Sequence, residues 1–136
     1  MTWFRRQQPV TANAIEFDGE GVYQIALPDL GYGLVFEDNG DTGYLYVTDP
    51  LFSNIEDAVH LYDYGDANQL KKGQKAFVVW SADLKKAGLY YGDQFQAGVD
   101  FQKKQAVSRT GFPRNGNPPW SADHTWRDAV VAGLET

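Results

Sequence analysis

Two histidines, His60 and His124, are the side chains best suited to act as a base near neutral pH. Each could activate a nearby hydroxyl, such as that of Ser81 or Ser121. The chain has no G-x-S-x-G turn, no H-E-x-x-H pair and no second histidine at ligand spacing. Because an isolated histidine more often packs or caps than reacts, we predict that the protein is not an enzyme.

A second candidate is Glu37–Asp41, which places three carboxylates and an asparagine within five residues. Such oxygen atoms could bind a hard cation such as calcium. The spacing is not that of an EF-hand, because Asp49 stands where the bidentate glutamate would be required. Asp, Asn and Gly are also the residues that form tight turns. We therefore expect a hairpin turn here, and no metal or other cofactor.

Paired carboxylates could perform acid–base catalysis if the fold held them at a fixed distance. Glu37 with Asp38 and Glu56 with Asp57 are adjacent pairs. Adjacent residues of a strand point to opposite faces, which argues against a shared site for either pair. A small enzyme that uses His60 or a carboxylate pair nevertheless remains the alternative hypothesis.

Nucleotide binding is not indicated by the glycines. Gly31 and Gly33 precede a predicted strand, whereas a phosphate-binding loop follows a strand and leads into a helix.

The segment from Tyr62 to Asp66 alternates tyrosines with carboxylates. Tyrosine is enriched in protein interfaces, and carboxylates complement a basic partner. Together with the Glu37–Asp41 segment, this pattern predicts a partner-binding surface composed of Glu37, Asp38, Asp41, Tyr62, Asp63, Tyr64 and Asp66.

Charge is divided unevenly along the 136 residues, whose net charge is −6. Residues 1–68 contain two basic and twelve acidic groups, and residues 69–136 contain ten basic and six acidic groups. So acidic a chain is not expected to bind nucleic acid. The absence of cysteine, of a signal peptide and of an apolar run of about 20 residues predicts a cytoplasmic location away from membranes.

Alternating apolar residues predict strands at 14–17, 22–27, 34–38, 44–48, 76–80, 87–91 and 94–101. Asn39-Gly40 and Gly92-Asp93 supply the turn residues for two hairpins. Ser53 and Glu56 form the pattern of a capping box, which predicts a helix with Ile55, Ala58, Val59 and Tyr62 on one face. A second helix is predicted from Ser121 to about Leu134.

These elements predict an α+β fold, in which a single antiparallel sheet of about five to seven strands carries two amphipathic helices on one side. The length predicts one domain, spanning residues 1–136. A loop rich in Gly, Pro and Asn at 111–119 would precede the C-terminal helix.

The segment from Val35 to Tyr46, followed by Ile55-Glu-Asp-Ala-Val-His-Leu-Tyr62, resembles an uncharacterised bacterial family of unknown function. The pattern of that family is an F-E-D-x-G-x-T-G-Y-x-Y hairpin and an I-x-D-A helix, with a later W-S dipeptide that Trp80-Ser81 matches. The resemblance covers roughly residues 32–113 and implies no particular reaction.

Small, acidic, cysteine-free bacterial proteins also resemble, in composition, the immunity proteins that neutralise secreted toxins. Many such toxins are basic, and an acidic inhibitor gains association rate and selectivity from complementary charge. We therefore expect a non-enzymatic, protein-binding domain with a basic partner. A structural or oligomeric scaffold, in which exposed strand edges pair between copies, is a further alternative.

Overall fold

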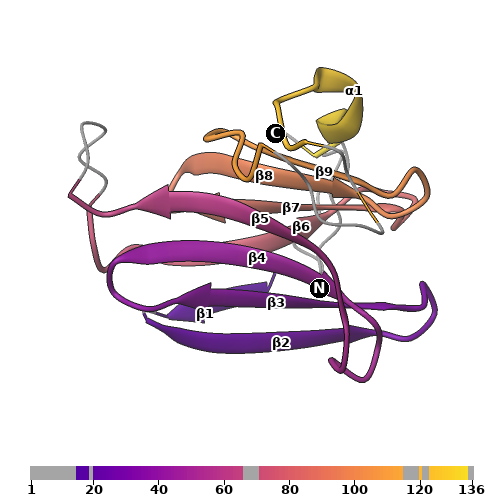
Figure 1. Ribbon diagram of the computed structural model, residues 1–136, viewed down its shortest axis with the longest axis horizontal. Coiled ribbons are helices and arrows are strands. Elements are labelled where there is room, and N and C mark those ends of the chain that lie inside the picture. The colour runs from indigo at the N-terminus through magenta and orange to yellow at the C-terminus, as the bar shows by residue number, and fades with distance from the viewer. Residues whose placement is uncertain (1–14, 19, 66–70, 115–119, 121–122, 135–136) are drawn as a thin grey trace.

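The computed structural model describes residues 15–18, 20–65, 71–114, 120 and 123–134 (Figure 1). Within them lie nine strands and one short helix. These are β1 Ile15–Asp18, β2 Gly21–Leu27, β3 Tyr32–Asp38, β4 Thr42–Thr48, β5 Ile55–Asp63, β6 Lys75–Trp80, β7 Lys86–Tyr91, β8 Gln94–Asp100, β9 Gln105–Ser108 and α1 Asp128–Val131.

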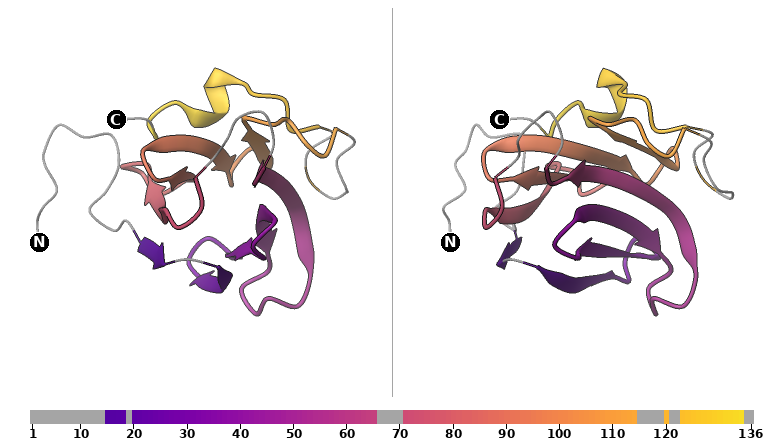
Figure 2. Two further views of the ribbon diagram at one scale, coloured as in Figure 1. Left: turned by 90° about the vertical axis from the view of Figure 1, so that its left-hand side faces the viewer. Right: turned by 60° about the vertical axis from the view of Figure 1, so that its left-hand side comes forward.

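The strands form two antiparallel sheets, one with the order β1-β6-β7-β8-β9 and the other with the order β2-β3-β4-β5. The sheets lie in two layers (Figure 2). Leu34, Leu45 and Val59 of the smaller sheet share one buried core with Leu89 and Val99 of the larger. The predicted single sheet with two helices on one side is therefore wrong. The core is closed by a second sheet, as in a β-sandwich.

The hairpin predicted around Asn39-Gly40 is confirmed, with β3 and β4 as its strands. Gly40 has a φ of 91°, which glycine adopts without strain. The Asn39 side-chain oxygen accepts hydrogen bonds from the backbone amides of Asp41 and Thr42, both at 2.9 Å. The strands predicted in the second half correspond to β6, β7 and β8, whereas β9 was not predicted.

The predicted helix at 53–62 is wrong, because these residues form β5 and the loop before it. Asp49, not Ser53, organises that loop, and its carboxylate accepts bonds from the amides of Leu51, Ser53 and Asn54. Hydrogen bonds from Ser53 lower the pKa of Asp49 to about 2. The pairing of β5 with β4 shifts register twice, so that β5 does not keep the period-two alternation expected of a strand.

The predicted C-terminal helix is reduced to the four residues of α1. The backbone carbonyl of His124 accepts a hydrogen bond from the Ser108 amide at 3.1 Å, which holds this segment alongside β9. The segment reaches Arg127 in an extended conformation, so the helix begins only at Asp128. Residues 121–122 of the predicted helix lie outside the described residues. So do residues 115–119 of the predicted loop.

The C-terminal segment covers the outer face of the larger sheet. Val130, Val131 and Leu134 pack there against Phe95 and Val107, and α1 contacts β7, β8 and β9. In Figure 2 α1 lies on the side of the larger sheet that faces away from the smaller one. The part of the chain that the structure describes places no helix over the outer face of the smaller sheet.

Gly98 of β8 makes this cover possible, because a Cβ atom added to it would lie 2.5 Å from Val131 Cγ1. We expect Gly98→Ala to displace the C-terminal segment and to lower the free energy of unfolding by about 1–3 kcal/mol. Urea denaturation would measure the loss. Gln94→Ala, at an exposed position of the same strand, is the control. An unchanged midpoint for Gly98→Ala would show that the segment is not packed on β8.

Candidate interaction surface and adjoining pocket

The outer face of the smaller sheet carries a row of aromatic side chains, here called the aromatic stripe: Tyr46, Tyr44, His60 and Phe112. The Tyr44 ring stacks on Tyr46 at 5.9 Å between centroids and meets His60 edge-on at 5.2 Å. His60 meets Phe112 at 6.2 Å, and Phe112 is 45% exposed. The register Tyr44↔His60 and Tyr46↔Ala58 places the β4 and β5 members side by side.

Glu37 lies on the same face and accepts a hydrogen bond from the Tyr46 hydroxyl at 2.7 Å. Burial, together with the bond to Glu37 and its charge, raises the pKa of Tyr46 well above its ordinary value. The phenol therefore stays protonated and continues to donate. Exposed apolar side chains of Val22 and Ile55, at 60% and 57%, extend the face at its sides.

The fold converts the charge division of the sequence into a division in space. Residues 21–63, which supply all of β2 to β5, contain eight carboxylates and no Lys or Arg. Residues 71–114, which supply β6 to β9, contain nine Lys and Arg against three carboxylates. The charged side chains of the smaller sheet are therefore all acidic, apart from its histidine, whereas four of the five strands of the larger sheet lie in a segment with an excess of basic groups.

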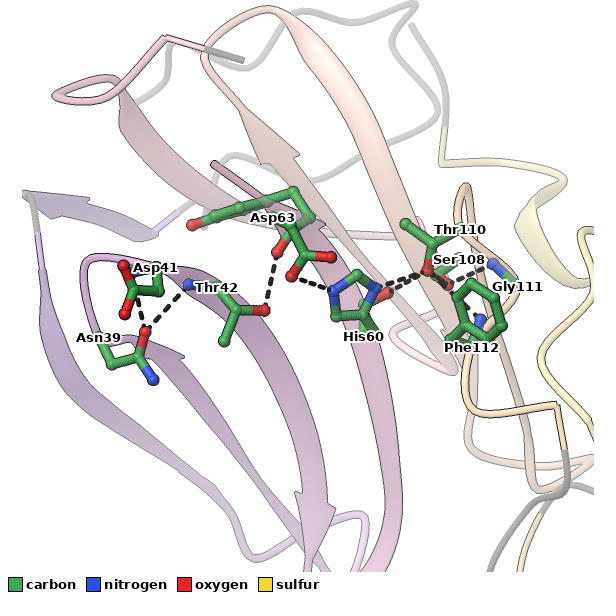
Figure 3. A network of polar contacts seen from close by, with 10 residues as sticks. Asn39, Asp41, Thr42, His60, Asp63, Ser108, Thr110, Gly111 and Phe112 are labelled. Atoms are coloured by element: carbon green, nitrogen blue, oxygen red, sulfur yellow. Dashed lines mark hydrogen bonds and ion pairs between the residues drawn. The ribbon is translucent and has the colours of Figure 1, made fainter. Parts of the chain in front are cut away.

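The two segments predicted to bind a partner lie next to each other. The Tyr64 amide donates to the Asp41 carbonyl at 2.9 Å, and the Thr42 hydroxyl donates to the Tyr62 carbonyl at 2.9 Å. Figure 3 shows the Asp41 end of the hairpin beside Asp63 at the end of β5. The hairpin tip and the post-β5 residues thus form one end of the acidic sheet.

Within this predicted set, the side chains have different surroundings. Asp41 and Asp63 are exposed and Glu37 is on the outer face, but Asp38 and Tyr62 are buried at 4% exposure each. Asp38 and Tyr62 therefore face the interior and do not lie on the outer face with Glu37. Tyr64 is half-buried, and Asp66 lies outside the described residues.

Asp38 is the acceptor of a buried hydrogen-bond cluster. Its Oδ2 accepts from the hydroxyls of Tyr62 at 2.8 Å and Tyr64 at 2.6 Å, and its Oδ1 accepts from the Gly40 amide at 2.9 Å. The Tyr64 and Tyr91 hydroxyl oxygens lie 2.7 Å apart. Burial and the bonds to Asp38 raise the pKa of both Tyr62 and Tyr64, so both phenols remain donors.

A pocket of about 250 Å³ adjoins this cluster at one end of the two sheets. Its lining includes the carboxylates of Glu20 and Asp38, the rings of Tyr64 and Tyr91, and the side chains of Lys72 and Gln74. Lys72 Nζ lies 5.2 Å from the centroid of the Tyr64 ring. The pocket therefore brings two negative groups and one positive group around an aromatic face.

His60 lies at the centre of a polar network (Figure 3). Its Nε2 is 2.8 Å from Asp63 Oδ1, and its Nδ1 is 2.9 Å from Thr110 Oγ1. The bond to His60 lowers the pKa of Asp63. Thr110 Oγ1 also donates to the His60 carbonyl at 3.0 Å and accepts from the Phe112 amide at 3.3 Å.

The order carboxylate–imidazole–hydroxyl is one that nucleophilic catalysis uses. In this chain the Thr110 hydroxyl is held by backbone groups on both sides, and the His60 amide donates to the Phe112 carbonyl at 2.9 Å. The network therefore fastens residues 110–112 to the edge of β5. Of the predicted hydroxyl partners, Ser81 bonds to Asp83 at 2.7 Å, and Ser121 lies outside the described residues.

His124 is fully buried and pairs with Asp57, with Nε2 2.7 Å from Asp57 Oδ1. Its Nδ1 lies 2.6 Å from the Pro113 carbonyl oxygen. Burial alone lowers the pKa of His124, but the bonds to Asp57 and Pro113 and the charges of Asp57 and Asp123 together raise it above 6.5. The pair connects β5 to the C-terminal segment and faces no solvent.

No metal centre is found among the described residues, since none of them form a group of three or more His, Asp or Glu side chains suited to an ion. In the Glu37–Asp41 turn, Asp38 accepts from the Gly40 amide and Asn39 accepts from the amides of Asp41 and Thr42. These residues therefore perform the turn chemistry that the sequence predicted.

Several residues of the surface and pocket were not predicted from the sequence. Tyr44 and Tyr46 are two positions apart in a predicted strand, and this spacing could have placed them on one face. No comparable local pattern predicts Thr110, Phe112 and Glu20. Each lies at its site because of contacts between segments that are distant in the sequence.

The fold and surface define a two-sheet antiparallel β protein with one acidic, aromatic outer face. The chain belongs to the DUF2251 family, described as an uncharacterized protein conserved in bacteria, whose model matches residues 18–135. The resemblance to a bacterial family of unknown function is thereby confirmed. No curated protein and no solved structure matches the chain. Within the described residues, no helix is long and apolar enough to cross a membrane.

Proposed function

We propose that the protein is a non-enzymatic, protein-binding domain that presents the acidic outer face of β2 to β5 to a basic protein in the cytoplasm. The observation that carries the proposal is the composition of this face. It combines the aromatic stripe, in which Phe112 is 45% exposed and Tyr44 and Tyr46 are half-buried, with the charge of residues 21–63. These residues include eight carboxylates, of which Asp38 and Asp57 are buried, and no basic side chain. Aromatic side chains supply contact area with little loss of conformational freedom, and carboxylates steer a basic partner into place.

The partner class that best fits such a surface is a basic bacterial toxin, which the protein would neutralise as an immunity protein. Such an inhibitor carries a charge opposite to that of its toxin, which raises the association rate and the selectivity of binding. Salt reduces both effects. The contact region comprises the aromatic stripe with Glu37, Asp41 and Asp63 at its acidic end. The buried Asp38 and Tyr62 support this region from behind.

Association should be measured with the product of a toxin gene that neighbours the gene of this protein. We expect association to weaken by about tenfold or more between low salt and 0.5 M salt, because exposed charges are then screened. Tyr44→Ala and Asp41→Lys should each weaken binding, because they remove the centre of the stripe and reverse an exposed charge.

Gln102→Ala, an exposed change beyond the end of β8, is the control and should leave binding unchanged. If no toxin gene lies beside this gene, or if association with its product does not respond to salt, the immunity role is excluded. Equal effects of Tyr44→Ala and Gln102→Ala would place the contact surface elsewhere.

A further inference from the structure

The geometry points to the pocket at the end of the two sheets as a binding site for an organic ammonium or guanidinium group. The pocket lies where five separate segments meet: Glu20 before β2, the β3–β4 turn, Tyr64 after β5, Lys72 to Gln74 before β6, and Tyr91 of β7. Its volume of about 250 Å³ is smaller than most sites for drug-sized ligands, which begin at about 300 Å³. It matches the end of a lysine or arginine side chain or a small free amine.

The inner wall of the pocket carries a carboxylate that no cation neutralises within the described part of the chain. Asp38 is 4% exposed, and its three hydrogen bonds come from two phenols and one backbone amide. Oδ1 accepts only the Gly40 amide, so it retains acceptor capacity. A buried carboxylate without a paired cation favours a positive group in the adjoining space.

The outer wall adds a second carboxylate. Glu20 is exposed and lies against the turn, since a Cβ atom added to Gly40 would be 3.2 Å from both Glu20 carboxylate oxygens. A cation in the pocket would therefore lie between an inner and an outer carboxylate. This arrangement attracts cations and repels carboxylates and phosphates.

The pocket already shows which group it accepts. The Lys72 ammonium lies 5.2 Å from the centroid of the Tyr64 ring, within cation–π range. Among the described contacts, Lys72 makes no ion pair with Asp38 or Glu20. A cation that also reached Asp38 or Glu20 would make contacts that Lys72 lacks and would displace it. Lys72 thus acts as a competing internal ligand.

Two sources could supply the cation. One is a lysine or arginine side chain of the basic partner, because the pocket adjoins Asp41 and Tyr64 at the acidic end of the sheet; this source rests on the proposed function. The other is a free amine in solution. The chemistry of recognition is the same for both.

The test is a titration of the full chain with n-butylammonium chloride, followed by calorimetry or by NMR shifts of the Tyr64 and Gly40 signals. We expect dissociation constants in the millimolar range, about what so small a ligand can reach. Methylguanidinium should bind similarly, and butyrate should not bind.

Variants identify the site. Glu20→Gln and Tyr64→Leu should each weaken butylammonium binding by about threefold or more. Lys72→Ala should strengthen it, because the competing ammonium is removed. Asp29→Asn makes the same charge change as Glu20→Gln at an exposed turn and should have no effect. Binding of butyrate, weaker binding by Lys72→Ala, or equal effects of Glu20→Gln and Asp29→Asn would overturn the assignment.

A competition experiment separates the two sources. If a partner side chain fills the pocket, saturating butylammonium and Glu20→Gln will both weaken the complex with the toxin. If the complex is unaffected while butylammonium still binds, the ligand is a free amine. The titration uses the protein alone, so its outcome does not depend on whether the immunity proposal is correct.

Discussion

Replacing His124 by Ala is expected to lower the free energy of unfolding by about 3–5 kcal/mol, which is the usual effect of breaking a buried ion pair. His124 is 0% exposed, and its Nε2 lies 2.7 Å from Asp57 Oδ1. Without the imidazole, Asp57 would remain in the core with only the Ala58 amide as a donor to Oδ1. Asp57 Oδ2 already has no hydrogen-bond partner within the described structure.

The same pair should make stability depend on pH. The pKa of His124 in the folded protein is raised above 6.5, so the folded state binds the proton more tightly than the unfolded state. The contribution is fully present below pH 6.5 and is lost as the pH rises through the folded pKa. Chemical denaturation from pH 5 to pH 9 should show a decrease above pH 6.5 that His124→Ala lacks.

His60→Ala is the matched control, since His60 also pairs with a carboxylate, but with one that is 53% exposed. His60→Ala should lower the free energy of unfolding by about 1 kcal/mol, because the Asp63 carboxylate becomes hydrated when the imidazole is removed. In the double variant Asp57→Leu/His124→Leu much of the stability lost in His124→Ala should return. Equal losses for His60→Ala and His124→Ala would show that burial of the Asp57 pair adds nothing.

The hairpins could be predicted because their information is local. Asn39-Gly40 and Gly92-Asp93 specify turns through their own backbone preferences, and the flanking residues alternate. β5 could not be predicted in this way. Ile55, Ala58, Val59 and Tyr62 have helical spacing, and two register shifts against β4 remove the alternation that would have indicated a strand.

Ser53 shows why a motif can mislead. Its hydroxyl suits a helix cap, yet it donates to Asp49 Oδ2 at 2.6 Å in a loop that leads into β5. The helix predicted in the C-terminal segment is wrong for a different reason. Its apolar spacing correctly marks the buried side chains of Val130 and Leu134, but backbone pairing beside β9 and the buried His124 prevent a long helix.

For the candidate surface, the sequence identified the acidic residues and predicted that Glu37 and Asp38 face opposite sides of a strand, but it did not show which side is buried. Glu37 and Asp38 are neighbours in a strand and therefore face opposite sides, one outward to Tyr46 and the other inward to Tyr62. The uneven charge of the two halves of the chain becomes a difference between two surfaces because β2 to β5 form a sheet of their own. The pocket could not be predicted without the full topology, since its walls come from five distant segments.

Asp38→Asn is expected to lower the free energy of unfolding by about 1–3 kcal/mol, while Asp41→Asn should change it by less than about 0.5 kcal/mol. An amide at position 38 has one accepting atom, whereas the carboxylate uses two. If the amide oxygen accepts from Tyr62 and Tyr64, the amide nitrogen opposes the Gly40 N–H. If the amide is turned round, both phenols lose their acceptor.

Asp41→Asn removes the same formal charge from a side chain that is exposed at the hairpin tip. Urea denaturation and toxin binding, measured on both variants, separate the two roles of the acidic turn. Asp38→Asn should lower stability, and Asp41→Asn should weaken binding at unchanged stability because an exposed charge steers the partner. The opposite pattern, with Asp41→Asn unstable and Asp38→Asn stable, would mean that the exposed carboxylate forms the turn. The contact surface would then have to be sought along the aromatic stripe alone.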